Sequence, residues 1–274
     1  MQPVSFSVTE NRRIEGETKV RERMDMKVTY IHHSSFAVEL DQAVLLFDYF
    51  EGMLPEFPED KPLIIFASHF HADHYGPLIF DLAGRRERVC CILSEDIRKK
   101  VPREWVDRVF FVKPGRIITV TENLEVRDAA MVEKSAGESC LLQAETLHST
   151  DEGCAFWISC GGTELYHAGD LNNWWWEGED KAWNHNMAAV YGREMKKLAG
   201  RKADAAFIPV DPRLGDAFYL GAAGFMEQAD AAHLFPMHFW GDFGAAGRLS
   251  AHPASAGWRE RIVNIQKEGE EFEL

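Results

Sequence analysis

The chain has 274 residues, of which 46% are hydrophobic and 27% are charged, so its composition fits one large folded domain and excludes a disordered or fibrous protein. Acidic residues outnumber basic residues by 44 to 30, which argues against nucleic acid or an anionic membrane as a partner. The five cysteines form no C-x-x-C pair, and we find no signal peptide and no apolar run of about 18 residues, so we expect a cytoplasmic protein.

The predicted elements begin with a short N-terminal segment and a group of strands. Residues 1–25 are polar and have no steady period, which predicts an arm or an edge strand outside the core. From Lys27 onwards apolar and polar residues alternate, and residues 43–47 are continuously apolar, as in paired strands. Leu63–Ala67 is a short apolar run after a proline, which is typical of a strand buried on both faces.

Further along the chain, helical and strand patterns alternate without a flexible linker or a short repeat. Helices are predicted over Tyr75–Ala83, Asp96–Val101, Ala182–Leu198 and Ala222–Leu234, with Ser94 as a candidate cap of the second. Strands are predicted over Arg116–Val120, Ser139–Thr146, Cys154–Ser159, Glu164–His167 and Ala205–Val210. We therefore expect residues 1–274 to form a single α/β domain with two similar halves.

The strongest chemical signal is the segment HFHADH, residues 69–74, which directly follows the predicted buried strand. Single histidines elsewhere, such as His32, His185 and His252, are interpreted as packed or surface residues. Three imidazoles and one carboxylate within six residues are different, because histidines packed this closely need a metal ion or a strongly lowered pKa to avoid repulsion. Imidazole and carboxylate are ligands that Zn²⁺ prefers, so the segment predicts a metal site.

This His-x-His-x-Asp-His segment resembles the signature of the metallo-β-lactamase-like superfamily, and the resemblance extends over a core of residues 26–245. It implies an α/β (α+β) fold, a four-layer αββα sandwich of two mixed sheets flanked by helices. It also implies a centre with two metal ions. In this scheme His69 and His71 bind the first ion, whereas Asp73 and His74 bind the second.

The remaining ligands implied by the resemblance lie downstream at strand ends. Asp170 matches an aspartate that bridges both ions, although an aspartate after glycine is also common in turns. His238 matches the last histidine of the second site. The remaining ligand of the first site is His148 or Asp151; His148 is preferred, but Asp151 lies closer to the glycine that precedes the next strand.

The implied cofactor is a pair of divalent metal ions, with zinc expected and manganese or iron as alternatives, which a carboxylate at Asp151 would favour. Two ions about 3.5–4 Å apart share a water and lower its pKa towards 7, so a bridging hydroxide would be the nucleophile. Asp73 or Asp170 would orient it and carry a proton to the leaving group. Asp48 is a candidate to hold the ring of a ligand histidine.

Three further segments, residues 33–35, 169–176 and 211–213, resemble a branch related to ascorbate-phosphate lactonases and uncharacterised bacterial hydrolases. The successive tryptophans Trp174, Trp175 and Trp176 would form an aromatic wall for the substrate, or else a packing or oligomer contact. Arg213 would pair with a substrate carboxylate or phosphate, or else form a structural salt bridge. His33 and Tyr219 are candidates for polar contacts with a leaving group.

These features predict a metal-dependent hydrolase that cleaves an ester, lactone or phosphoester bond in a small-molecule substrate. A di-iron oxidoreductase and a phosphodiesterase or nuclease on the same scaffold are alternatives. The acidic composition argues against a nuclease. A non-enzymatic binding module with structural ions is a weaker alternative, because structural zinc sites are usually closed and rich in cysteine. A homo-oligomer is left open.

Overall fold

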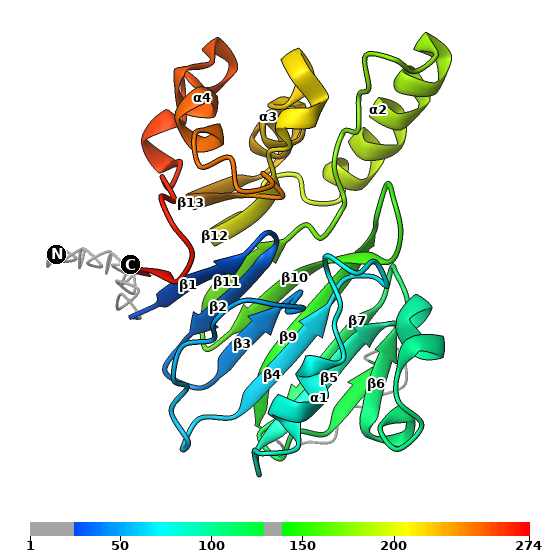
Figure 1. Ribbon diagram of the computed structural model, residues 1–274, viewed down its shortest axis with the longest axis vertical. Helices are drawn as coiled ribbons and strands as arrows, with labels where there is room; N and C mark the ends of the chain where they lie inside the picture. The colour runs from blue at the N-terminus through cyan, green and yellow to red at the C-terminus, as the bar shows by residue number, and fades with distance from the viewer. Residues whose placement is uncertain (1–24, 129–138) are drawn as a thin grey trace, which may run out of the picture.

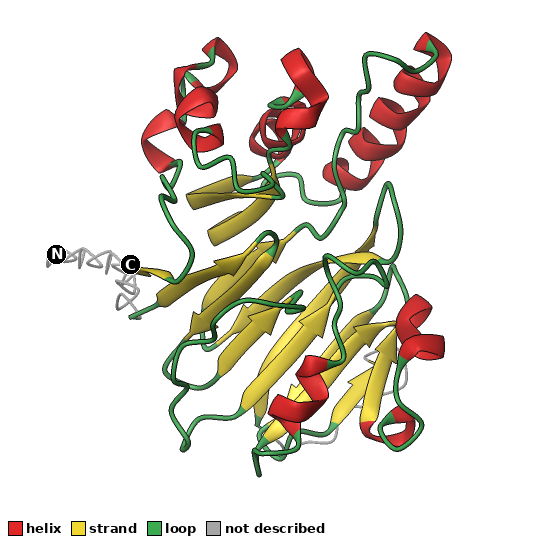
Figure 2. Ribbon diagram, in the orientation of Figure 1, coloured by secondary structure: helices red, strands yellow, loops and turns green. Residues whose placement is uncertain are grey.

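The computed structural model describes residues 25–128 and 139–274, which form two seven-stranded β-sheets packed face to face with helices on the outside (Figures 1 and 2). The expected sandwich of two mixed sheets with flanking helices is therefore confirmed. Residues 1–24, nearly all of the predicted N-terminal arm, lie outside the described residues. No helix in the described part of the chain is long and apolar enough to cross a membrane.

The first sheet has the strand order β14-β1-β2-β3-β4-β5-β6, with β3 to β6 parallel. In β4, Ile64 and Phe66 enter the core between the sheets, whereas Leu63 and Ile65 enter an outer cluster. Both faces of β4 are therefore buried, which explains its uninterrupted apolar sequence. The strands are β1 Lys27–His32, β2 Ser35–Glu39, β3 Val44–Phe47, β4 Leu63–Ala67, β5 Val89–Ser94, β6 Val109–Val112 and β14 Glu270–Glu273.

The second sheet has the order β13-β12-β11-β10-β9-β7-β8, in which β11, β12 and β13 are parallel and the other pairs are antiparallel. Parallel neighbours end at the same edge of a sheet, so the segments that follow β11, β12 and β13 come together. The strands are β7 Ile117–Thr121, β8 Val126–Asp128, β9 Cys140–His148, β10 Cys154–Cys160, β11 Thr163–His167, β12 Lys202–Pro209 and β13 Asp230–Met237.

The helices cover the outer faces of the sheets. On the first sheet, α1 contacts β5, and on the second sheet α3 contacts β12 and β13 and also packs against α2 (Figure 1). The α-helices are α1 Leu78–Ala83, α2 Lys181–Lys196, α3 Leu220–Gln228 and α4 Ala245–Ala251. Short 3₁₀ helices span Glu95–Lys100, Val106–Arg108, Pro212–Ala217, Pro253–Ser255 and Arg259–Arg261.

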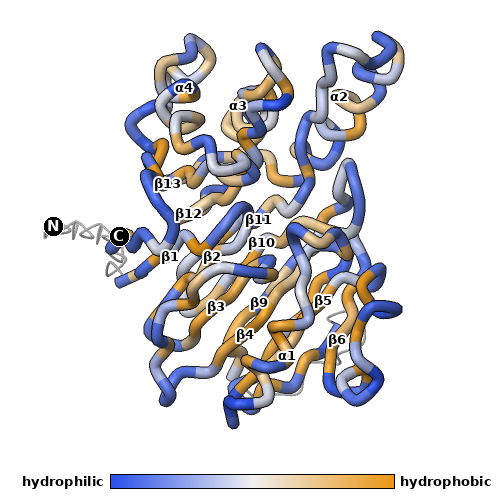
Figure 3. The backbone as a smooth tube through the Cα atoms, in the orientation of Figure 1, coloured by the Kyte–Doolittle hydropathy of each residue, from blue (hydrophilic) through white to orange (hydrophobic). Residues whose placement is uncertain are grey.

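The core between the sheets is rich in aromatic rings and extends to the edge where the site lies. The Phe66 ring lies 5.3 Å from that of Phe47 and 5.1 Å from that of Phe156, measured between centroids. His167 stacks on Phe47 at 4.9 Å. Figure 3 shows the same pattern along the backbone, with hydrophobic segments in the strands and hydrophilic segments in the connecting loops. The packed strands thus support the loops at the edge where the site lies.

The predicted helix Ala222–Leu234 is wrong in its second half. The helix α3 ends at Gln228, and the strand β13 begins at Asp230. The alanine-rich segment after Gln228 has no strong local preference, and the parallel pairing of Leu234 with Ala206 in β12 decides its conformation. The chain beyond residue 245 also contributes a strand to the first sheet, because β14 pairs with β1.

Candidate metal centre

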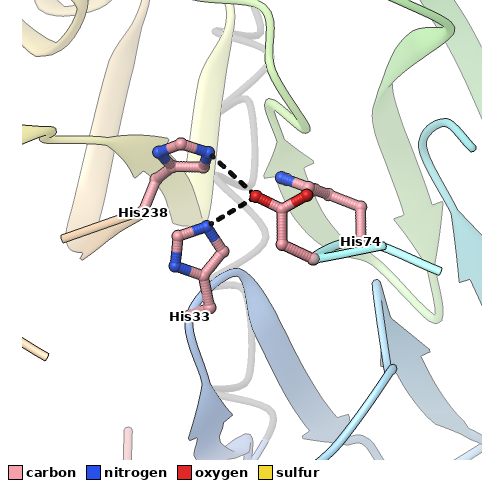
Figure 4. Close-up of side chains that lie close together, drawn as sticks. His33, His74 and His238 are labelled. Carbon is pink, nitrogen blue, oxygen red and sulfur yellow. Dashed lines mark ion pairs between the residues drawn. The ribbon is translucent and has the colours of Figure 1, made fainter. Parts of the chain in front are cut away.

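Two groups of side chains that can bind metal ions lie next to each other at one edge of the sheets. The first group contains His69, His71, Asp151 and Asp170, and the second group contains His33, Asp73, His74 and His238. Within each group, one ligand atom of each residue lies within 4.8 Å of those of the others. Figure 4 shows His33, His74 and His238 close together, with dashed lines marking ion pairs. Asp73 Oδ2 is 3.5 Å from His33 Nε2 and 3.9 Å from His238 Nε2.

Strand ends and tight turns carry these residues to the same place. The segment His69–His74 follows β4, Asp170 follows β11, and His238 directly follows β13. His33 lies in the turn between β1 and β2, and Asp151 lies in the loop between β9 and β10. The arrangement joins five separate parts of the chain, which is why no single segment of the sequence contains the complete site.

Two glycines allow the loops that carry Asp151 and Asp170 to approach the end of β4. Gly153 has φ +67°, and a Cβ atom there would lie 2.0 Å from the Ser68 carbonyl oxygen. Gly169 has φ +49°, and a Cβ atom there would lie 2.5 Å from Ser68 Cβ. Real Cβ atoms do not come so close, and a positive φ further disfavours other residues. Both positions therefore require glycine.

The Asp170 carboxylate lies between the two groups. Its Oδ1 is 3.1 Å from His74 Nε2 and 3.5 Å from His238 Nε2, which both belong to the second group. Its Oδ2 is 3.6 Å from His69 Nε2 of the first group. One oxygen thus faces each group, as a bridging ligand requires.

Burial and neighbouring charges set the protonation of the site. Burial lowers the pKa of His69 to about 3 and the pKa of His33 to about 4, so both imidazoles are neutral at pH 7 and present lone pairs. Burial would also lower the pKa of His74, but the Asp170 and Asp48 carboxylates outweigh it and raise this pKa well above its ordinary value. A positive charge is therefore favoured between His74 and Asp170.

Three buried atoms that face this space, His33 Nε2, His74 Nε2 and Asp170 Oδ1, have no hydrogen-bond partner among the described residues. His74 Nδ1 donates to Asp48 Oδ2 over 2.7 Å, which leaves a lone pair on Nε2 pointing at the Asp170 carboxylate. A buried lone pair facing an anion is unfavourable unless a proton or a cation lies between them. The donor atoms therefore fit divalent cations that accept nitrogen and oxygen ligands.

Two fully buried carboxylates hold the rings of the second group. Asp48 accepts hydrogen bonds of 2.7 Å from Ser68 N, Ser68 Oγ and His74 Nδ1, which is the role expected for it. Asp211 Oδ2 accepts a hydrogen bond of 3.0 Å from His238 Nδ1. Each bond fixes the tautomer whose Nε2 is free to bind a metal. The contact from Asp211 was not predicted, although Asp211, like Asp48, follows an apolar strand.

The structure separates the two candidates for the remaining position of the first group. Asp151 Oδ2 lies 3.3 Å from His71 Nδ1, whereas His148 is exposed and lies outside the group. The geometry therefore favours Asp151 over His148, and we propose Asp151 as the remaining ligand of the first group. The reason is that β9 continues through His148, which pairs with Cys154, so the chain turns towards His71 only afterwards.

The four residues predicted to contact substrate divide into two pairs. Trp174 and Arg213 border the cavity above the metal groups. His33 is instead a member of the second group. The Tyr219 ring stacks on His252 with centroids 3.9 Å apart and borders a different cavity, so the structure does not bring it to the metal groups.

The cavity has a volume of about 360 Å³ and borders both groups. The residues that line it include Asp151 and Asp170 of the first group and Asp73 and His238 of the second. Four tryptophans also line it, namely Trp174, Trp176, Trp183 and Trp240. Of these, Trp174 and Trp176 belong to the run of three tryptophans singled out from the sequence. A small molecule in this cavity would therefore reach the ligand atoms of both groups.

A two-sheet sandwich that carries a His-x-His-x-Asp-His loop at the sheet edge defines a protein of the metallo-β-lactamase type. A family model described as "Beta-lactamase superfamily domain" matches residues 27–185, more than half of the chain. The chain belongs to this family. The narrower resemblance to ascorbate-phosphate lactonases stays a prediction.

Individual relatives agree with this family. The chain is 26% identical over 268 residues to a UPF0173 metal-dependent hydrolase of Opitutus terrae, covering 91% of this chain and 100% of the relative. Igni18, a metallo hydrolase from Ignicoccus hospitalis, has a TM-score of 0.57 at 15% identity, covering 91% of this chain and 98% of that one. CmlA, a diiron β-hydroxylase from Streptomyces venezuelae, has a TM-score of 0.52 at 13% identity, covering 93% and 54%. The two structural likenesses show the fold alone.

Proposed function

We propose that this protein is a metal-dependent hydrolase with a dinuclear centre that cleaves an ester, lactone or phosphoester bond of a small molecule. The main support for this proposal is the position of Asp170, because its two carboxylate oxygens face two different groups of ligand atoms. Both groups border one cavity of about 360 Å³, which gives a substrate access to them. Structural metal sites are usually closed, so an open pair of sites supports catalysis.

In this proposal His69, His71 and Asp151 hold one ion, and Asp73, His74 and His238 hold the other, with Asp170 shared. His33 Nε2 offers a further donor to the second ion. When bound, such a pair of ions lowers the pKa of a shared water towards ~7 and stabilises the negative charge that develops on the substrate. Zinc suits both groups, and the carboxylate of Asp151 makes the first group more favourable for manganese or iron than an imidazole would.

The chain itself supplies the proton transfers. Burial opposes the ionisation of Asp73, but the neighbouring His33 ring and the charge of His74 lower its pKa below the ordinary range, so the carboxylate is ionised at neutral pH. Asp73 also borders the cavity, and its side chain is 30% exposed. It is therefore placed to accept a proton from the attacking water and to return it to the leaving group.

Removal of the metal should abolish hydrolysis, because neither group contains a serine or cysteine to act as the nucleophile and the bound ions would activate water instead. The protein is treated with a chelator, dialysed, and reloaded separately with Zn²⁺, Mn²⁺ and Fe²⁺. Phenyl acetate, a γ-lactone and bis(4-nitrophenyl) phosphate are then assayed in oxygen-free buffer. We expect at least one to be hydrolysed by the reloaded protein and none by the stripped protein. Hydrolysis that survives metal removal, or turnover that requires oxygen and a reductant, would contradict the proposal.

A further inference from the structure

The cavity above the metal groups contains a guanidinium group held in a fixed position. Arg213 Cζ lies 4.4 Å from the ring centroid of Trp240 and 5.6 Å from that of Trp176. Arg213 Nε and Nη2 lie 2.9 Å and 2.5 Å from Asp211 Oδ2. Within residues 25–128 and 139–274, the third nitrogen, Nη1, makes no hydrogen bond, and the side chain is 48% exposed. Arg213 thus has an ordered donor that is free for a ligand.

The tryptophans beside Arg213 form an apolar surface for the rest of that ligand. The rings of Trp174 and Trp176 are nearly parallel, with an interplanar angle of 5° and centroids 6.2 Å apart. Trp174 Nε1 donates to the Asp170 carbonyl oxygen over 2.9 Å, which fixes the ring beside the centre. Trp183 and Trp240 are 41% and 50% exposed, and large apolar side chains exposed together at a cavity are typical of binding sites.

The charged residues that line the cavity determine the orientation of a ligand within it. Among the described residues that line the cavity, Arg213 is the only arginine or lysine, whereas Asp73, Asp151 and Asp170 are acidic. A negatively charged group on the substrate is therefore attracted to Arg213. Asp211 Oδ2 accepts hydrogen bonds from both Arg213 and His238, so it fixes the position of Arg213 relative to the second group.

We propose that the substrate is a small anion with a planar or apolar body, whose anionic group pairs with Arg213 while its body packs on the tryptophans. This orientation directs the bond to be cleaved towards the metal groups. The inference rests on the proposed function, because it names the substrate class of the same site. A carboxylate, a phosphate or a sulfonate has the required chemistry.

Calorimetric titration of the metal-loaded protein with benzenesulfonate and with neutral methyl phenyl sulfone tests the proposal. A sulfonate is a weak metal ligand, so its binding reports on Arg213 rather than on the ions. We expect wild-type protein to bind benzenesulfonate about tenfold more tightly than the sulfone, since a hydrogen bond to a charged group has this effect. Arg213→Gln should lose the preference. Arg248→Gln is the matched control, because Arg248 is 47% exposed, pairs with Asp242 and lies outside the cavity.

The metal content of each variant is measured alongside. If Arg213→Gln also loses metal through Asp211, Arg213→Lys is used instead; it keeps a positive charge beside Asp211 and should show a preference of about threefold. An unchanged preference in an Arg213 variant that retains its metal would overturn the inference, as would equal binding of the two probes to wild type. Failure of hydrolysis would count against the proposed function alone, because the binding comparison needs no turnover.

Discussion

Replacing Asp170 with asparagine is expected to lower kcat/KM by about 10³-fold or more and to reduce the bound metal to at most one ion per chain. One carboxylate oxygen lies 3.1 Å from His74 Nε2 and the other lies 3.6 Å from His69 Nε2, so Asp170 belongs to both groups. Asparagine has nearly the same shape but carries no charge and can offer only one good acceptor. Metal analysis of the purified variant and steady-state kinetics measure the two effects.

Asp242→Asn is the control for this change, because the Asp242 side chain is 42% exposed and pairs with Arg248 away from the cavity. It should keep the metal content and activity of the wild type. Circular dichroism shows whether the Asp170 variant is folded. A folded Asp170→Asn protein that keeps two ions and more than about a tenth of the wild-type kcat/KM would contradict a shared ligand, since that loss is below 1.4 kcal/mol.

Replacing Asp151 with alanine is expected to remove the ion of the first group and to lower kcat/KM by about 10²-fold or more, whereas His148→Ala should leave the metal content unchanged. Asp151 Oδ2 is 3.3 Å from His71 Nδ1, and its removal leaves the first group with one carboxylate fewer to balance a divalent charge. Metal content per chain at a fixed free metal concentration measures the difference.

His148→Ala is the matched comparison because both residues flank the same loop. Through its backbone nitrogen His148 donates to Glu194 Oε2, a bond that alanine can also make, so the variant should fold. The opposite order, with His148→Ala losing metal and Asp151→Ala retaining it, would return the ligand assignment to the histidine.

Several features of the fold could be predicted from the sequence because they depend on local patterns. The strand Leu63–Ala67 was predicted with its correct ends, since burial on both faces leaves a continuous apolar run. The ligand segment was recognisable because three histidines and an aspartate lie within residues 69–74. The strand before Asp170 was also predicted from its pattern, whereas the strand end before His238 was implied by the resemblance; the structure brings both residues to that segment.

Other features depend on contacts between distant segments and could not be read from local patterns. The residues Asp230–Leu234 become part of a strand because β12 lies beside them, although their alanines suggested a helix. The choice of Asp151 over His148 depends on where β9 ends. The placement of His33 opposite Asp73 depends on the turn between β1 and β2, which is far from residues 69–74 in sequence. The bond between Asp211 and His238 likewise joins the ends of two different strands.

The central claim is that two groups of ligands hold two cations and share Asp170. It is tested most directly by anomalous diffraction from crystals of the metal-loaded protein, recorded at the absorption edge of the bound metal. We predict two peaks about 3.5–4 Å apart, one beside His69, His71 and Asp151 and the other beside Asp73, His74 and His238, with one Asp170 oxygen bound to each. A single peak, or two peaks of which only one contacts Asp170, would contradict the claim.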